Sequence, residues 1–340
     1  MTNAAVLERL RRIGRAATDS RALRSAVLAE VGRVLPFDAY VWPLTDPETS
    51  VATSPLASVP RPLMPDLPRL IRLKYLTPVN RWTGLSRAVR LDPPADSLLW
   101  RELLRGHGVT DVASAVFRDR YGCWAFLDLW RLGGVFGADE LAVLDDLTSL
   151  LTEDLRRCEA ATFTATGGSR DPGPVVLVLD ADLHVRGQTP QTHDYLARLL
   201  PPGGERPALE PVPAAAYNVA AQLVAVEQGV DSQPPLARVH LAGGRWLTLR
   251  AARLGPDERI AVTVEETSPA ERTAVFARAC GLAERETELL RHLTTGADTR
   301  TVAARMFLSR NTVQDHLKSI FDKTGTRSRR ALLSRALGTA

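Results

Sequence analysis

The residue types best suited to chemistry gather in one stretch near the carboxy terminus. Arg310, Gln314 and Lys318 follow one another at a spacing of four residues, and Asn311 and Asp315 lie beside them. Side chains four residues apart share one face of an α-helix, so this face would carry a guanidinium, amides and an ammonium. Such groups hydrogen-bond the edges of bases in the major groove of DNA. The spacing therefore predicts a helix that reads a DNA sequence.

Apolar residues on the other side of the same helix would hold it against a core. Val313, Leu317, Ile320 and Phe321 recur at spacings of four, three and one, which is typical of a buried helical stripe. Ser309 stands where a helix N-cap belongs, and a short helix is expected over Thr299–Met306, just before it. A short helix, a tight turn and a second helix with a polar outer face make a helix-turn-helix.

The residues expected to bind DNA come from the starts of both helices and from basic positions that follow them. The later positions are arginine or lysine and would meet phosphates, which fix the orientation of the protein on the duplex. The full set is Thr299, Arg300, Ser309, Arg310, Asn311, Thr312, Gln314, Asp315, Lys318, Lys323, Arg327 and Arg329.

The distribution of charge supports a polyanion-binding carboxy terminus. The chain has 340 residues with 43 basic and 39 acidic side chains, a net charge of only +4. Residues 271–340 hold 13 basic and 7 acidic residues, a net charge of +6, which leaves −2 for the first 270 residues. A basic end on a mildly acidic body indicates that the two parts have different tasks.

Two breaks in the hydrophobic pattern divide the chain. Residues 161–173 are rich in threonine, glycine and proline and are expected to be a linker. The second break precedes Ser268, Pro269 and Glu271, a combination that marks the start of a helix. The predicted domains are therefore 1–160, 174–266 and 270–340.

The first predicted domain mixes helices and strands. Residues 111–118 and 122–131 have the composition of two strands joined by a turn. The second strand is apolar on both faces, so it is expected at the centre of a sheet. A helix over 20–34, a strand over 38–42 and an amphipathic helix over 138–158 complete the prediction.

The second predicted domain is a small α+β unit with an antiparallel sheet, and the third is all helical. In the second, two strands are expected within 175–187, a helix over 192–200, and strands over 236–242, 245–254 and 259–266. In the third, helices are expected over 284–293, 299–306, 309–324 and 329–337.

The helical domain resembles the LuxR-type helix-turn-helix of bacterial transcription regulators. The resemblance rests on L-x-x-R-E-x-E-L-L (282–290), on Gly296, on V-A-x-x-x-F-L-S-x-x-T-V-x-x-H-L-x-x-I-x-x-K (302–323) and on R-x-R (327–329). It covers about 55 residues and implies a four-helix domain that dimerises and reads a two-fold DNA site. It also implies that Ser309–Lys318 lie on the recognition helix.

Three positions matter most within this resemblance. Glu286 matches a glutamate of the family's first helix and is expected to help hold the helices together. Ala283 stands where the family usually has a capping threonine, and Gln314 where it usually has lysine. Glutamine favours a contact to adenine or a water-mediated contact, so the DNA sequence read would change more than DNA binding itself.

The two preceding domains resemble sensory modules at the level of fold. Residues 20–160 resemble a GAF domain, and residues 174–266 resemble a PAS domain. The expected fold class is thus multidomain, with two α+β sensory domains, GAF-like and PAS-like, followed by an all-α four-helix helix-turn-helix domain. A fold resemblance of this kind names no ligand.

Aromatic residues suggest where a small ligand could bind. Five of the six tryptophans lie in the first domain, and Tyr40, Trp42 and Trp124 are the candidate lining of a pocket. The alternative is that these side chains are ordinary core residues, since aromatic side chains are generally well buried.

Several function classes find no support in the sequence. It has no P-loop and no protease, hydrolase or paired-cysteine motif, so we expect no enzyme, no metal and no cofactor. Three dispersed cysteines and an arginine-bearing amino terminus indicate a cytoplasmic protein with no membrane segment. The expected partners are double-stranded DNA, a second copy in a homodimer, RNA polymerase and a small-molecule ligand at residues 1–266. The competing hypothesis is an adaptor whose helical tail docks a partner protein.

Overall fold

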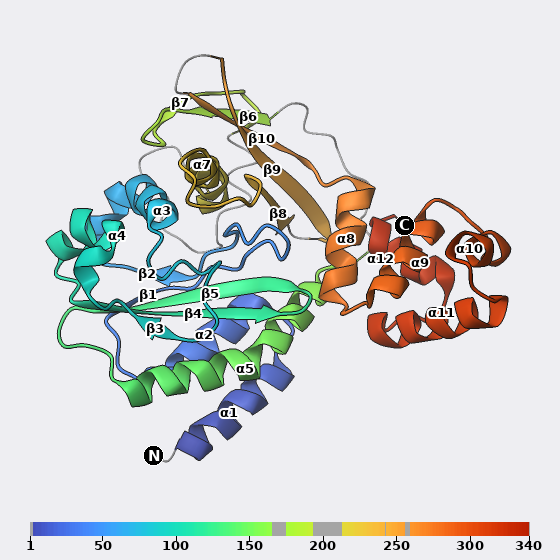
Figure 1. The fold of residues 1–340 in the computed structure, drawn as a ribbon, viewed down its shortest axis with the longest axis horizontal. Coiled ribbons are helices and arrows are strands. Elements are labelled where there is room, and N and C mark those ends of the chain that lie inside the picture. The colour runs from blue at the N-terminus through green and yellow to red at the C-terminus, as the bar shows by residue number, and fades with distance from the viewer. Residues whose placement is uncertain (1–2, 165–174, 193–212, 242, 256–258, 340) are drawn as a thin grey trace. The chain divides into compact units, whose positions relative to one another are not determined.

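The computed structural model describes residues 3–164, 175–192, 213–241, 243–255 and 259–339. The chain forms two compact units (Figure 1). The first unit comprises residues 1–155, 172–239 and 247–265, and the second comprises 156–171, 240–246 and 266–340. Residues 193–200 of the predicted helix 192–200, and residues 165–173 of the predicted linker 161–173, lie outside the described residues.

A five-stranded sheet with the order β2-β1-β5-β4-β3 forms the amino-terminal part of the first unit (Figure 1). The predicted hairpin over 111–131 is confirmed, and its second strand lies at the centre of the sheet with eight of its ten residues buried. The strands are β1 (Ala39–Val41), β2 (Ala57–Ser58), β3 (Val89–Arg90), β4 (Asp111–Asp119) and β5 (Gly122–Arg131).

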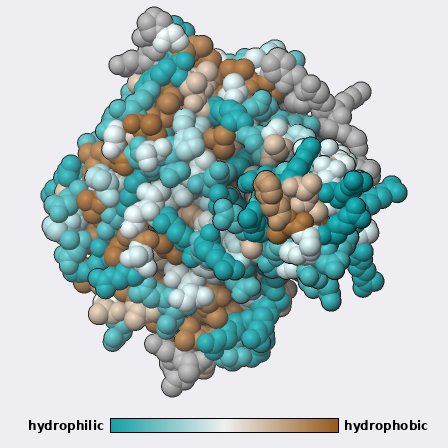
Figure 2. Space-filling view, turned by 45° about the vertical axis from the view of Figure 1, so that its right-hand side comes forward, coloured by the Kyte–Doolittle hydropathy of each residue, from teal (hydrophilic) through white to brown (hydrophobic). Residues whose placement is uncertain are grey.

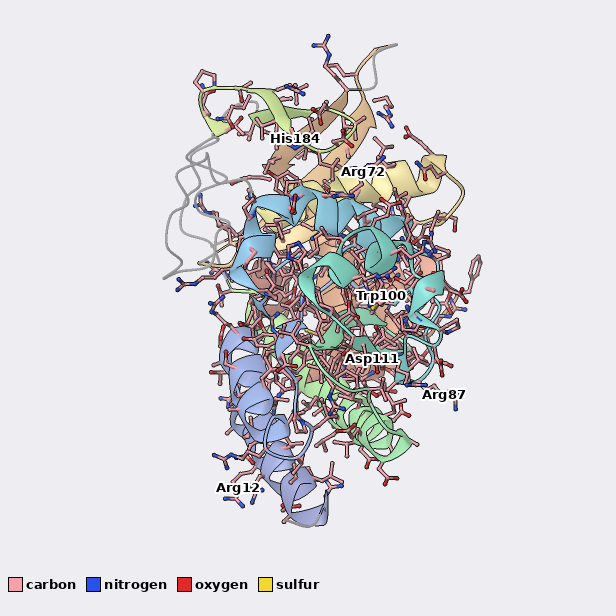
Figure 3. The ribbon with its side chains drawn as sticks, turned by 90° about the vertical axis from the view of Figure 1, so that its left-hand side faces the viewer. Arg12, Arg72, Arg87, Trp100, Asp111 and His184 are labelled. Atoms are coloured by element: carbon pink, nitrogen blue, oxygen red, sulfur yellow. The ribbon has the colours of Figure 1, made fainter. Side chains whose placement is uncertain are left out.

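Helices cover both faces of this sheet. Figure 1 shows α1 (Asn3–Ala16), α2 (Ser20–Val31) and α5 (Ala138–Ala161) on one face, with α3 (Leu67–Leu76) and α4 (Leu98–Glu102) on the other. The amphipathic pattern of 138–158 predicts a leucine stripe, of which Leu144, Leu147, Leu151 and Leu155 are buried and Leu141 is half-buried. Asp111, at the start of β4, lies inside the fold, whereas Arg12 projects from α1 (Figure 3).

A second five-stranded sheet follows, with the order β7-β6-β10-β9-β8. Its strands are β6 (Val175–Leu179), β7 (Val185–Gln188), β8 (Leu236–Leu241), β9 (Arg245–Arg253) and β10 (Ile260–Glu266), as predicted to within a few residues. The sequence did not predict α7 (Ala214–Glu227), which packs against α3. The residues of α7 itself are mostly small or apolar on every side of the helix. Its sequence therefore shows no alternation of polar and apolar faces from which a helix could be predicted.

Buried ion pairs cross the first unit between its two sheet-containing parts. Asp46, in the loop after β1, accepts two hydrogen bonds from the guanidinium of Arg238 on β8, with Nε–Oδ2 at 2.7 Å and Nη2–Oδ1 at 2.8 Å. Both side chains are almost completely buried. A second pair joins Arg81 and Asp231 at 2.6 Å. Burial would raise the pKa of Asp46, but the hydrogen bond and charge of Arg238 hold that pKa below its ordinary value.

The second unit contains five helices in its described part: α8 (Pro269–Ala279), α9 (Glu284–Thr294), α10 (Thr299–Met306), α11 (Arg310–Thr324) and α12 (Arg329–Leu337). The four predicted helices are confirmed to within one residue at each end. The predicted helix start is also confirmed, because Ser268 and Glu271 form a reciprocal capping box at the start of α8.

Within the described part of the chain, no helix combines the length and the apolar character that a bilayer crossing requires. The three cysteines, Cys123, Cys158 and Cys280, are all buried as free thiols. Burial raises the pKa of Cys123, and it raises the pKa of Cys280 to about 12.

Candidate nucleic-acid interface

The helix-turn-helix is built from α10, a short turn and α11. Asp298 caps α10 by accepting the amide N–H of Thr301 at 2.7 Å. Ser309 caps α11 by accepting the amide N–H of Thr312 at 3.1 Å, as the sequence predicts. In the predicted apolar stripe of α11, Val313, Leu317 and Ile320 are buried and Phe321 is half-buried. Val302, Ala303 and Met306 of α10 are buried as well. These contacts fix which face of α11 remains outside.

The outer face of α11 consists of polar side chains without intramolecular partners. Arg310, Asn311, Gln314, Asp315 and Lys318 are all exposed. Within the described part of the chain, none of these five side chains takes part in a hydrogen bond or an ion pair. In Figure 2, much of the right-hand part of the surface is hydrophilic, and a smaller hydrophobic patch lies within it. Side chains in this condition are available to a ligand in solution.

The remaining predicted DNA-binding residues differ in their exposure and in whether their side chains already have a hydrogen-bond partner. Arg300 and Arg327 are exposed, and Thr299 is half-buried. Thr312 shares a hydrogen bond with Ser309, with 2.9 Å between the two hydroxyl oxygens. Arg329 instead donates to the carbonyl of Ala297, so this guanidinium already has a partner within the domain.

Lys323 is also engaged inside the domain. Its ammonium lies 2.6 Å from Oε2 of Glu286, and the hydroxyl of Ser319 donates to Oε1 of the same carboxylate at 2.6 Å. Glu286 also accepts the backbone N–H of Ala283 at 2.6 Å. Burial would raise the pKa of Glu286, but these hydrogen bonds hold it below its ordinary value. The expectation that Glu286 holds helices together is confirmed, since it joins α9 to α11.

Phe307, in the turn between the two helices, has an unusual environment. Its side chain is 95% exposed, and its backbone adopts a left-handed conformation with φ of 56°. The residue ends α10, and its amide N–H donates to the carbonyl of Ala304. An exposed phenylalanine gains nothing from burial, and a left-handed backbone is unfavourable for any residue with a side chain.

The three aromatic residues predicted to line a pocket have separate contacts in the structure. Trp42 is fully buried and stacks on Phe117, with ring centroids 5.1 Å apart. Tyr40 is half-buried. Because Tyr40 pairs with Leu129 of β5, it lies on the face of the sheet opposite to Phe126 and Asp128. Trp124 lies at a register shift between β4 and β5, where the regular alternation of side chains is interrupted. The indole N–H of Trp124 donates to Asp119 at 3.0 Å.

A polar cluster on the other face was not found from the sequence. Lys74 of α3 lies 2.6 Å from Asp128 of β5, and Ser114 of β4 donates to the same carboxylate at 2.6 Å. Trp82 and Phe126 stack beside it at 4.6 Å, with the ammonium 5.8 Å and 5.4 Å from their centroids. One signal was available, because Lys74 is the one lysine in the first 270 residues and Asp128 is the one charge inside an apolar strand.

The described residues contain no group of three or more His, Cys, Asp or Glu side chains placed to hold a metal ion. The charged clusters described above are ion pairs or capping interactions. Unlike these clusters, the outer face of α11 presents polar side chains that have no partner within the described residues.

Comparison with known proteins locates a family domain at this site. Residues 281–336 match the family described as bacterial regulatory proteins, luxR family. No curated protein sequence matches the chain. Among solved structures, CepR2 of Burkholderia cenocepacia, an N-acylhomoserine lactone dependent LuxR family factor, is 20% identical, with a TM-score of 0.34 over 45% of this chain and 92% of that one.

Two structures of SdiA also match. The Escherichia coli protein is 12% identical, with a TM-score of 0.37 over 99% of this chain and 96% of that one. SdiA in complex with octanoyl-rac-glycerol is likewise 12% identical, with a TM-score of 0.35 over 99% and 94%. TM-scores at this level do not establish a common overall fold.

Proposed function

From the premise that residues 281–336 are a DNA-binding domain of the LuxR family of bacterial regulatory proteins, we propose that the chain is a transcription regulator acting as a dimer. Two copies would place their α11 helices in successive major grooves, about 34–36 Å apart on a two-fold site. α12 and residues 138–158 are the candidate dimer surfaces. RNA polymerase is a further proposed partner, and the proposed location is the cytoplasm.

The observation that carries this proposal is the uncommitted outer face of α11. Arg310, Asn311, Gln314 and Lys318 are exposed and have no partners within the described part of the chain. A buried stripe fixes the helix on its other side, so these groups are held ready for an external surface. Arginine and lysine suit guanine, and asparagine and glutamine suit adenine. A protein-docking face would instead be rich in apolar and aromatic side chains.

We further propose that the first unit senses a signal. Its two sheets have the same strand order. In each sheet the second and first strands in the chain lie at one edge, and the fifth, fourth and third strands follow in that order across the sheet. This order supports the GAF-like and PAS-like interpretation. A small-molecule ligand at residues 1–266, with Tyr40, Trp42 and Trp124 as candidate contacts, would act by binding one conformation more tightly than another.

Selection of bound duplexes from random DNA by the full-length protein tests the proposal. The expected result is a symmetric site, with affinity that falls steeply as salt rises because phosphate contacts release counterions. Lys318→Ala should weaken binding to all sequences, whereas Asn311→Ala or Arg310→Ala should change the preferred bases. Arg291→Ala removes an exposed charge on α9 and serves as the control. A uniform loss in all three variants would contradict the assignment of base contacts.

One observation favours the competing function, an adaptor that docks a protein. Phe307 is the most exposed large apolar side chain in the described part of the chain. If the chain recovers no DNA at low salt, but binds a partner protein that Phe307→Ala abolishes, the adaptor function replaces the proposed one.

A further inference from the structure

Arg272, on α8, is a buried charge with no carboxylate partner in the part of the chain that the structure describes. Only 4% of the residue is exposed. Its guanidinium donates to three backbone carbonyls, those of Gly244 at 2.7 Å, Thr164 at 3.1 Å and Arg335 at 3.2 Å. Burial lowers the pKa of Arg272 to about 10. A buried cation held only by carbonyls depends on all of them, because each lost acceptor leaves an unsatisfied donor.

Arg335, on α12, is half-buried and also donates to three backbone carbonyls. Its guanidinium donates to the carbonyl of Phe163 at 2.9 Å, to that of Ala160 at 3.1 Å, and to that of Thr324. Ala160 lies in the last turn of α5, and Thr324 is the last residue of α11. A cation is favourable at the carboxy-terminal end of a helix. Here one cation serves the ends of two helices, one of which is the predicted recognition helix.

An aromatic stack lies between the two arginines. Phe163 is fully buried and stacks on Trp246 of β9, with ring centroids 4.7 Å apart. It meets Phe276 of α8 edge-on at 5.3 Å, and the guanidinium carbon of Arg272 lies 5.1 Å from its centroid. Chain segments that are far apart in sequence thus share one small core.

The β8–β9 turn and the segment after α5 are also in contact through their backbones, independently of Arg272 and Arg335. Gly244, in the turn before β9, has φ of 75°. A Cβ atom at this position would lie 2.8 Å from the carbonyl oxygen of Thr164. Only glycine allows this approach, so the turn is in direct backbone contact with Thr164, three residues after the end of α5.

We infer that Arg272, Arg335 and Phe163 form a clasp that transmits conformational change from α5 and the β8–β9 turn to the recognition helix. The clasp lies within the second unit, but α5 begins in the first unit, and the turn connects two strands of the first unit. Withdrawing either segment leaves buried donors unsatisfied, so the contacts are lost together rather than one at a time. Such an all-or-none element is what coupling between two sites requires.

Hydrogen exchange of the full-length chain tests the clasp without any DNA. Arg272→Lys keeps the charge but cannot reach three carbonyls, and Gly244→Ala separates the turn from Thr164. In either variant, amide exchange should rise about tenfold in residues 160–164, 243–246 and 324–338 together. Arg291→Ala, on the exposed side of α9, should change none of them. A rise confined to the neighbourhood of each substitution would overturn the proposal.

A second arm rests on the proposed function and uses duplex DNA at low salt as the probe. In the natural chain, DNA should protect residues 310–318 and also change exchange in 160–164 and 243–246, since coupling is reciprocal. Arg272→Lys and Gly244→Ala should keep the protection of residues 310–318 by DNA but lose the change in exchange at 160–164 and 243–246. An unaltered remote change in the variants, or none in the natural chain, would overturn the clasp. Absence of any protection at 310–318, with the first arm as expected, would contradict the proposed function and leave the clasp supported.

Discussion

At the scale of single residues, Phe307 combines two unfavourable features. Gly325 and Gly338 end their helices with φ of 64° and 73°, a conformation that costs glycine nothing. Phe307 ends α10 in the same region of backbone space with a full side chain. That conformation costs about 1–2 kcal/mol for a residue with a Cβ atom, and an exposed ring recovers none of it by burial.

Phe307→Gly should therefore raise the free energy of unfolding of the second unit by about 1 kcal/mol, the relief of strain less the added entropy of the unfolded chain. Urea unfolding followed by circular dichroism measures this change. Ala304→Gly, at an exposed position inside α10, should lower stability by about 1 kcal/mol. Equal effects of the two glycines would mean that the backbone of Phe307 is not strained.

The contribution of Glu286 to the stability of the folded domain depends on pH. Because its pKa is depressed in the folded state, its contribution is complete above the unfolded value near 4.5 and disappears as the pH falls through the folded pKa. Glu286→Gln should cost about 1–3 kcal/mol at neutral pH, and the cost should shrink below pH 4.5. Thermal unfolding across this range checks the sign, with the exposed Glu284→Gln as a control. A cost that grows in acid would be contrary to the depressed pKa.

At the scale of elements, the helix starts of the second unit are capped unequally. Serine or aspartate accepts from the first turn of α8, α10, α11 and α12. The N-cap residue of α9 is Ala283, whose side chain has no acceptor, so only the hydrogen bond from the Ala283 N–H to the Glu286 carboxylate is made. One amide in the first turn of α9 therefore lacks the side-chain partner that its neighbours have.

Ala283→Thr should supply that acceptor and stabilise the second unit by about 0.5–1 kcal/mol. The position is exposed and its backbone is extended, so a threonine fits without displacing a neighbour. Ala283→Val has the same shape without the hydroxyl and should give no gain. The unfolding temperatures of the natural chain, Ala283→Thr and Ala283→Val, measured by calorimetry, would decide whether any gain comes from the hydroxyl cap or from packing of the larger side chain.

Helices whose sequence has an apolar period and an N-cap residue could be predicted from the sequence. Helices that lack both signals could not. α10 and α11 were predicted within one residue because Ser309 and the stripe from Val313 to Ile320 mark both the start and the buried face. α7 has small apolar residues all round, so nothing distinguishes its faces. The Lys74–Asp128 pair joins α3 to β5, and only the tertiary fold brings them together.

At the scale of the whole molecule, the pair between Asp46 and Arg238 is the most buried charge interaction that crosses the first unit. Removing one partner of such a pair leaves the other charged and without water. Asp46→Asn should lower the free energy of unfolding by about 3–5 kcal/mol. Tryptophan fluorescence during urea unfolding is a suitable measurement, since five of the six tryptophans lie in residues 1–160.

Glu48 provides the matched control for this prediction. It contacts the same guanidinium at 2.8 Å, but its side chain is 48% exposed. Glu48→Gln should cost less than about 1 kcal/mol, because solvent screens an exposed pair. Because the pKa of Asp46 is depressed, the destabilisation by Asp46→Asn should decline only below the unfolded value near 3.8. Similar losses in the two variants would mean that burial does not set the strength of the Asp46 contact.

The burial of Cys123, Cys158 and Cys280 makes the folded chain inert to thiol reagents. Thiolates are the reactive form, and burial disfavours them. A colorimetric thiol reagent should count almost no sulfhydryls in buffer and three in urea. A cysteine introduced on the exposed side of α12, at Ala331, would then be the single site for a fluorophore. The natural chain is thus ready for single-label measurements of the DNA-binding domain, with no native cysteine to remove.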